Sequence, residues 1–174
     1  MKSLSMEEHK KHVPTDVKCG VITLSDSKYE DSKNNKNTDI SGENIIKILE
    51  KRNHTIEQYT IIPDNKDLLL KTIKEMNKKS IDVIFTTGGT GLESRDITIE
   101  TLKPLYDKEV PGFGELFRLK SYEELGSGAL LSRASAGVYN KTLIFSMPGS
   151  PNAVKTAMNI IKDEIAHIVK HTRK

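Results

Sequence analysis

The sequence has few of the residues that build covalent or metal cross-links. Its 174 residues include one cysteine, Cys19, which excludes an internal disulfide and a cysteine-rich metal site. His167 and His171 lie four residues apart, but the glutamate of the His-Glu-x-x-His zinc motif is absent. A chain of this length does not need such cross-links, because it can bury a sizeable hydrophobic core.

Long hydrophobic runs are also missing. No stretch approaches the roughly 18 apolar residues that span a bilayer, and residues 1–12 are too polar for a signal peptide. There is no tryptophan, aromatic residues make up 5%, and 27 basic residues nearly balance 24 acidic ones, giving a net charge of +3. We therefore expect a cytoplasmic protein that binds neither membranes nor nucleic acid.

Apolar runs that alternate with helical patterns are present along most of the chain. Helices are predicted from about residue 40 to 52, from Asp64 with the apolar face Leu69, Leu70, Ile73 and Met76, and over about 151–168. Strands are predicted at 17–24, 55–62, 82–87 and 142–147. Strands and helices that alternate at this spacing predict a three-layer α/β/α sandwich around a mostly parallel sheet.

Three segments fall outside this alternation. Residues 25–39 contain one apolar side chain, Tyr29, and are predicted to form a long mobile loop. Residues 104–128 are broken by proline and glycine and are predicted to contain one or two short helices, with a helix-like stretch at 115–125. Residues 1–16 are predicted to be a flexible N-terminal extension, and 17–174 a single domain.

The turns that follow the predicted strands carry the polar and glycine residues. Ligands of open α/β sheets bind at the carboxyl ends of the strands, so these turns are candidate binding sites. Ser25 and Asp26 follow the first strand, and Thr87, Gly88, Gly89, Thr90 and Gly91 follow the third. Glycines there let backbone N–H groups approach an anionic ligand, although a tight packing turn explains them equally well.

Two aspartates and one further turn complete this set. Asp64 and Asp96 each precede a predicted helix and could be N-caps, but as a pair on neighbouring strand ends they could share Mg²⁺. Pro148 and Gly149 precede Ser150, which is placed to cap a helix whose first residue is a proline. That helix N-terminus is either an ordinary helix start or part of an anion site.

Five motifs occur in order along the chain. They are Thr-Thr-Gly-Gly-Thr-Gly at 86–91, Ser-Arg-Asp-Ile-Thr at 94–98, Pro-Gly-Phe-Gly-Glu at 111–115, Leu-Ser-Arg-Ala at 131–134 and Met-Pro-Gly-Ser-Pro-Asn at 147–152. Together they resemble the MoaB/MogA family of molybdenum cofactor biosynthesis, and the MoaB branch most closely. The resemblance extends over residues 17–168, and five motifs in order are far more specific than one glycine turn.

The resemblance implies a molybdopterin-binding fold and a molybdopterin adenylyltransferase that uses MgATP. It implies that Asp64 and Asp96 are catalytic and hold the Mg²⁺. Some members of the MoaB branch lack these aspartates, whereas this sequence retains both, which favours an active enzyme. The family likeness also implies a trimer or a hexamer built from trimers, and a downstream molybdenum-inserting protein as a possible partner.

On this interpretation the remaining candidates bind substrate or nucleotide: Ser25, Asp26, Thr87, Gly88, Gly89, Thr90, Gly91, Ser132, Pro148, Gly149 and Ser150. Two other hypotheses stay open. The protein could bind molybdopterin without turnover, as a carrier or scaffold, although the retained aspartates argue against this. It could also be a flavodoxin-like carrier, but the scarcity of aromatic residues disfavours a flavin site.

Overall fold

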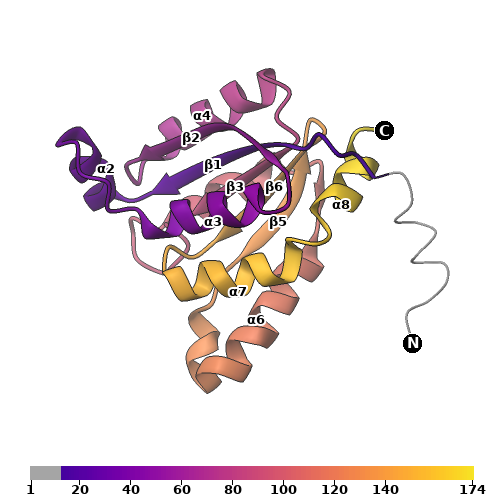
Figure 1. Cartoon of the computed structure of the whole chain (residues 1–174). Helices are drawn as coiled ribbons and strands as arrows, with labels where there is room; N and C mark the ends of the chain where they lie inside the picture. Colours follow the sequence, from indigo (N-terminus) through magenta and orange to yellow (C-terminus); the bar gives the residue numbers. More distant parts are fainter. Residues whose placement is uncertain (1–12) are drawn as a thin grey trace.

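The computed structural model describes residues 13–174, which build one six-stranded sheet (Figure 1). The strand order is β2-β1-β3-β6-β5-β4, and the first four strands in that order are parallel. The strands are β1 Lys18–Leu24, β2 Thr55–Ile62, β3 Val83–Thr87, β4 Lys108–Glu109, β5 Ser135–Tyr139 and β6 Thr142–Met147. The prediction of a mostly parallel sheet is confirmed.

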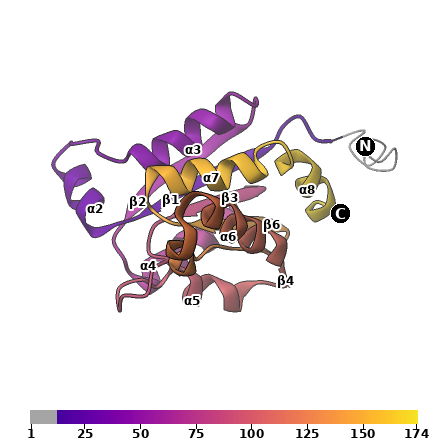
Figure 2. The same cartoon turned by 90° about the horizontal axis from the view of Figure 1, so that it is seen from below.

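Helices cover both faces of the sheet, so the predicted sandwich is confirmed. Helices α3, α7 and α8 lie on one face with α6 beside them, and α4 and α5 lie on the other (Figure 2). Their bounds are α2 Asp26–Lys33, α3 Ile40–Glu50, α4 Lys66–Lys78, α5 Thr98–Leu102, α6 Pro111–Leu125, α7 Pro151–Ile161 and α8 Ile165–Thr172. Two 3₁₀ helices, η1 Lys103–Leu105 and η2 Gly126–Leu131, follow α5 and α6.

The central strands are buried on both faces, which explains their continuous apolar sequences. Val21, Phe85 and Phe145 are register partners on β1, β3 and β6 and face α3 and α7. The rings of Phe85 and Phe145 stack with centroids 5.7 Å apart. Ile84 and Ile144 form the next partner pair and face α4 and α5 on the opposite side.

An antiparallel edge, which the sequence analysis did not predict, extends the sheet beyond β6. Strands β5 and β6 form a hairpin whose two loop residues, Asn140 and Lys141, have φ values of 45° and 68°. Positive φ at both positions suits the tight turns that join twisted strands. Asparagine followed by lysine is a weak hairpin signal, so strand β5 was not predicted.

The prediction of a mobile loop at 25–39 is wrong, because Asp26–Lys33 forms helix α2. Ser25 caps it by accepting a hydrogen bond from the N–H of Lys28 at 3.3 Å. Lys33 pairs with Glu30 one turn away, at 2.9 Å. No residue of α2 is buried, so the helix has no apolar stripe from which it could have been predicted.

Helix boundaries also differ from the predictions. Helix α4 begins at Lys66 after the cap Asn65, not at Asp64. The predicted helix over 151–168 is two helices, because the chain turns between α7 and α8 and thereby buries Ile165 and Val169 at the end of the sheet.

Helix α6 is longer and more regular than predicted for 104–128. It begins at Pro111, since a proline in the first turn loses no helical hydrogen bond. Gly114 lies against the backbone of Ala134, where a Cβ would stand 2.7 Å from the carbonyl oxygen. The glycine that looked like a helix breaker is therefore required for close packing of α6.

The predicted extension over residues 1–16 falls mainly on residues 1–12, which lie outside the described residues, so it stays a prediction. Among residues 13–174, no helix is long and apolar enough to cross a membrane.

Two neighbouring leucines of α4 test this packing. Leu69 is 0% exposed in the core with Ile73 and Met76, whereas Leu70, which was predicted on the same face, is only half-buried. We expect Leu69→Ala to lower the free energy of unfolding by about 2–5 kcal/mol, through lost burial and a residual cavity. Leu70→Ala should lower the free energy of unfolding clearly less. Urea unfolding measures both, and equal losses would contradict this packing.

Candidate functional site

The carboxyl ends of β1, β3 and β6 bring three of the predicted turns together. The N–H of Gly88 donates to the carbonyl oxygen of Met147 at 3.0 Å, and the hydroxyl of Thr87 donates to that of Pro148 at 2.9 Å. A Cβ at Gly149 would lie 3.2 Å from the Cα of Gly88. The turns after β3 and β6 are therefore in direct contact, as expected for neighbouring parallel strands.

Asp26 and Asp64 join the turns after β1 and β2. The N–H of Asp26 donates to Oδ2 of Asp64 at 3.3 Å, and the N–H of Asp64 donates to Oδ1 of Asp26 at 3.2 Å. Arg95, from the segment after β3, forms an ion pair with the carboxylate of Asp26. Sequence reasoning did not assign a role to Arg95, although it stands next to the predicted Asp96.

The second carboxylate oxygen of Asp64, Oδ1, is buried and has no hydrogen-bond partner. Burial raises the pKa of Asp64, and the carboxylates of Asp26 and Asp96 raise it further, while the N–H of Asp26 and the charge of Arg95 lower it. An unpartnered buried carboxylate oxygen is destabilising, and a cation would relieve that penalty. The donor set suits Mg²⁺, which binds one or two carboxylates together with phosphate oxygens.

Neither aspartate caps a helix. Asn65 caps α4 by accepting from the N–H of Leu68 at 2.9 Å, and α5 begins at Thr98 without a side-chain cap. Asp96 instead accepts from the N–H of Glu93 at 2.9 Å. The capping interpretation of both residues is therefore wrong. Within residues 13–174 no group of three or more histidine, cysteine, aspartate or glutamate side chains could hold a metal ion.

The glycines of the loop after β3 are all in close contact with neighbouring groups. Gly88 and Gly89 have φ values of 99° and 63°, and a Cβ at Gly88 would overlap the carbonyl oxygen of Leu24. A Cβ at Gly89 would lie 3.1 Å from Oδ1 of Asp64, and one at Gly91 would lie 2.5 Å from Oδ2 of Asp96. These close contacts account for the glycines by packing without excluding contact with a ligand, and the packing places the loop against both aspartates.

A cavity of about 200 Å³ opens at the carboxyl end of β1. Of the predicted residues, Ser25, Thr87 and Gly149 line it. The full lining is Thr23, Leu24, Ser25, Lys28, Thr38, Asp39, Ile40, Ser41, Thr87, Gly149 and Pro151. Ser25, Thr87 and Gly149 thus lie around this cavity, whereas Asp26, Gly89 and Gly91 lie around the two aspartates.

Asp39 is a buried carboxylate in the wall of this cavity. It caps α3, since it accepts from the N–H of Gly42 at 3.0 Å. It also accepts from the hydroxyls of Thr23 and of Tyr59, the latter at 2.6 Å. Burial and this hydrogen bond raise the pKa of Tyr59. No local sequence signal reveals this network, because Tyr59 lies on a neighbouring strand.

The two remaining predicted serines have different surroundings. Ser150 caps α7 as predicted, accepting from the N–H of Ala153 at 3.2 Å. Ser132 ends η2 and is half-buried. The next residue of the Leu-Ser-Arg-Ala motif, Arg133, contacts the glycine loop: it donates to the carbonyl oxygen of Gly91 at 3.0 Å.

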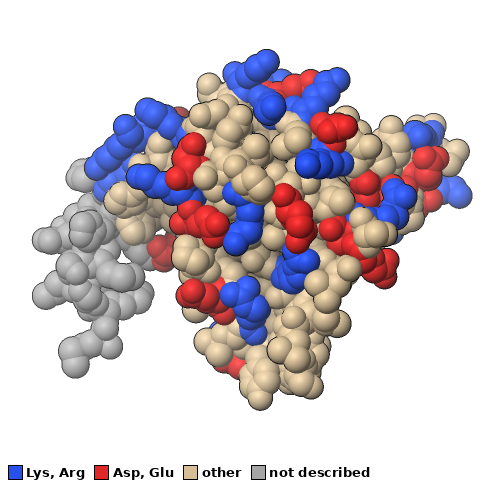
Figure 3. All heavy atoms as spheres, turned by 180° about the vertical axis from the view of Figure 1, so that it is seen from behind, with Lys and Arg blue, Asp and Glu red and all other residues tan. Residues whose placement is uncertain are grey.

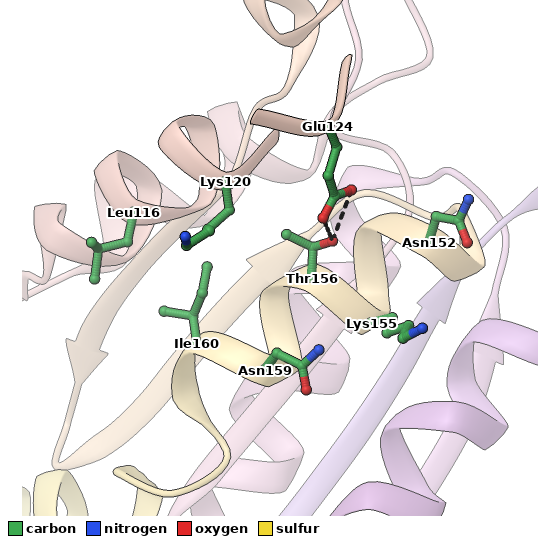
Figure 4. Close-up of a pocket in the computed structure, with 8 residues that line it drawn as sticks. All are labelled: Leu116, Lys120, Glu124, Asn152, Lys155, Thr156, Asn159 and Ile160. Atoms are coloured by element: carbon green, nitrogen blue, oxygen red, sulfur yellow. Dashed lines mark hydrogen bonds between the residues drawn. The ribbon is translucent and has the colours of Figure 1, made fainter. Parts of the chain in front are cut away.

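A larger cavity, of about 590 Å³, lies between α6 and α7 (Figure 4). Its walls include Leu116 and Ile160, and Glu124 accepts a hydrogen bond from Thr156 at 2.9 Å across it. It contains none of the predicted residues. The strand-end edge, which holds the aspartates and the glycine loop, is therefore the candidate functional site.

Comparison with known proteins matches this chain to a family described as "Probable molybdopterin binding domain", over residues 20–167. The chain belongs to the MoaB/MogA family. "Molybdenum cofactor biosynthesis protein B" of Bacillus subtilis is 46% identical over 175 residues, which cover 98% of this chain and 99% of that protein. The resemblance stated from the sequence is confirmed.

Two similar proteins come from Pyrococcus furiosus. "Molybdopterin adenylyltransferase" is 48% identical over 174 residues, covering 98% of this chain and 99% of that protein. The crystal structure of "tungsten cofactor synthesizing protein MoaB" has a TM-score of 0.83 and 47% identity, covering 92% of this chain and 99% of that one. The family members therefore share the fold over almost their whole length.

The raised pKa of Asp64 predicts how stability depends on pH. The folded state holds the Asp64 proton more tightly than the unfolded state, so stability falls as pH rises through the raised pKa. The side chain of Asp64→Asn has nearly the shape of aspartate but no charge, so this variant should raise the melting temperature of the ligand-free protein at pH 7.5. The difference should shrink as the pH is lowered toward 4.

The exposed Asp67, in the first turn of α4, is the matched control. Asp67→Asn should leave the melting temperature at pH 7.5 unchanged or slightly lower, because a negative charge is favourable there. A lower melting temperature for Asp64→Asn than for the unaltered protein at pH 7.5 would contradict this prediction, because it would show that the negative charge of Asp64 does not destabilise the folded state.

Proposed function

We propose that this protein is a molybdopterin adenylyltransferase. It transfers AMP from ATP to the terminal phosphate of molybdopterin and releases pyrophosphate. The observation that carries the proposal is the unpartnered Oδ1 of Asp64, buried beside Gly89 of the glycine loop. The name of the Pyrococcus furiosus relative supports it.

In the reaction, a phosphate oxygen of molybdopterin attacks the α-phosphorus of ATP. A new P–O–P bond forms, and the bond between the α-phosphorus and its bridging oxygen to the β-phosphate breaks. The phosphate nucleophile is already ionised near neutral pH, so no general base is required. The protein must instead hold two anions close together and stabilise the charge that develops on the pyrophosphate.

Mg²⁺ is the cofactor that these residues suit. Asp64 and Asp96 would hold it, and it would neutralise phosphate charge when bound. The carboxylates are oriented before any ligand binds: Asp64 accepts from the N–H of Asp26, and Asp96 accepts from the N–H of Glu93.

The other candidates bind the substrates in this proposal. Gly89, Thr90 and Gly91 contact phosphate oxygens through their backbone N–H groups, and Gly88, whose own N–H is bound to Met147, holds the loop in place beside them. Ser25, Asp26, Thr87, Ser132, Pro148, Gly149 and Ser150 contact the remaining parts of ATP and molybdopterin. We further propose that residues 17–174 act as one domain in the cytoplasm, and that the product passes to a molybdenum-inserting protein.

Pyrophosphate release from MgATP in the presence of molybdopterin tests the activity. We expect molybdopterin-dependent release by the unaltered protein, and a loss of about 10²-fold or more in Asp64→Ala and in Asp96→Ala, because each removes a charge that holds the cation. Asp67→Ala, on the exposed face of α4, should retain full activity.

The same assay separates the enzyme from a carrier. If the unaltered protein binds molybdopterin but releases no pyrophosphate with MgATP, it is a carrier and the adenylyltransferase proposal is wrong. If release occurs but survives both substitutions, the activity stands and the aspartates do not hold the cation.

We also propose that the chain forms a trimer or a hexamer built from trimers, through what we term the α6–η2 surface. Large apolar side chains are exposed there, with Leu130 at 85% and Tyr122 at 63%. Its members are Leu116, Leu119, Tyr122, Leu125, Leu130 and Leu131. The lower projection of the molecule, built by α6 and η2, carries few charged side chains in Figure 3. A patch of this kind is typical of a protein interface.

The mass in solution, measured by light scattering, tests this assembly. We expect the mass of a trimer or hexamer for the unaltered chain and a shift toward monomer in Leu130→Glu, since the new charge would be buried without a partner. Ile40→Glu, at a residue 61% exposed on α3, should not change the mass. A monomeric unaltered chain would contradict the assembly; a variant of unchanged mass would contradict the surface.

A further inference from the structure

One arginine links the glycine loop to two other parts of the chain. Nη1 of Arg133 donates to the carbonyl oxygen of Gly91 at 3.0 Å, and Nη2 forms an ion pair with Glu100 of α5. Arg133 itself lies between η2 and β5, and its side chain is only 26% exposed. The guanidinium group therefore connects three segments that are far apart in the sequence.

Thr98, the first residue of α5, holds the beginning of the same loop. Its hydroxyl donates to the carbonyl oxygen of Gly88 at 2.8 Å, and its N–H donates to that of Gly89 at 2.9 Å. Thr98 and Arg133 together therefore bind three carbonyl oxygens of the loop, those of Gly88, Gly89 and Gly91. Because Glu100 and Thr98 belong to the same short helix, both ends of the loop are tied to α5.

These bonds determine where the N–H groups of the loop point. In a planar trans peptide the N–H is directed opposite to the carbonyl of the preceding residue. The bound carbonyls of Gly88, Gly89 and Gly91 therefore orient the N–H groups of Gly89, Thr90 and Leu92 away from Thr98 and Arg133. Within residues 13–174, none of these three N–H groups donates a hydrogen bond, so they are available to an anion.

We propose that Arg133 is a positioning residue for adenylyl transfer, which fixes the glycine loop so that its N–H groups face the phosphates. This inference rests on the proposed function. Glu100 neutralises the charge of Arg133, so the arginine acts through the geometry of the loop and not by attracting phosphate. A lysine cannot replace it, because a single ammonium group lacks the fork that reaches a carbonyl and a carboxylate together.

The kinetic test compares Arg133→Ala, Arg133→Lys and the unaltered protein in pyrophosphate release. We expect both variants to lose about 10- to 100-fold in kcat/KM, as a small displacement of a positioning group does. Added guanidinium ion should restore part of the activity of Arg133→Ala but none of that of Arg133→Lys, whose side chain fills the space. Arg52→Ala breaks an arginine–aspartate pair of 2.8 Å remote from the loop and should match the unaltered protein.

Hydrogen exchange of the ligand-free protein provides a readout that does not need turnover. The amide of Glu93 donates to the carboxylate of Asp96, and the amide of Thr98 donates to the carbonyl oxygen of Gly89. Their exchange should become at least several-fold faster in Arg133→Ala, and the hydrogen-bonded amide of Thr55, at the opposite end of β2 from the loop, should be unchanged. Arg133→Lys serves in both measurements if the alanine variant does not fold.

The outcomes separate the two proposals. If the unaltered protein shows no turnover, the proposed function fails, and faster exchange in the variant would still support the role of Arg133 in holding the loop. If kcat/KM is unchanged in both variants, the positioning role is wrong. It is also wrong if activity falls while exchange is unchanged and guanidinium ion restores nothing.

Discussion

The structure of the site depends on the close approach of backbone segments at the carboxyl ends of β1, β3 and β6. Gly88 lies directly against the carbonyl oxygen of Leu24 and donates its N–H to that of Met147. Gly149 lies against Gly88 from the other side. A side chain at Gly88 would overlap the carbonyl oxygen of Leu24, so it would force the ends of β1 and β3 apart.

This approach concentrates negative charge. The pKa of Asp64 is raised, chiefly by burial and further by the carboxylates of Asp26 and Asp96. Arg95 pairs with Asp26 and offsets part of this charge, but Oδ1 of Asp64 is left without a donor. The buried oxygen without a partner is a cost to the ligand-free protein, and costs of this kind gather at functional sites.

The segment from α6 to β5 connects the outer surface of the molecule to this site. Its η2 part directs Leu130 and Leu131 outward, and Arg133, two residues further along the chain, reaches inward to Gly91. Packing of another chain on η2 would therefore stabilise the segment from which Arg133 projects. The cavity between α6 and α7 adjoins the same surface at Leu116 (Figure 4).

Much of the fold could be predicted from local patterns, because buried parallel strands are continuously apolar. The strands at 55–62 and 142–147 have the predicted bounds, and Ser150 caps its helix as predicted. Helix α2 could not be predicted from apolar spacing, because it is stabilised by a cap and local pairs and buries nothing. Strand β5 was missed because a five-residue strand with a central glycine has little pattern of its own.

The class of fold, the family and the turns that carry polar and glycine residues follow from periodicity and short motifs, so they can be predicted from the sequence. What those residues touch depends on how the chain folds. The tertiary structure excluded the capping interpretation of Asp64 and Asp96 and placed Gly89 beside an unpartnered carboxylate oxygen. It also brought Arg133 to the glycine loop from 42 residues away. Such contacts arise when strands pair and helices pack, and sequence spacing does not encode them.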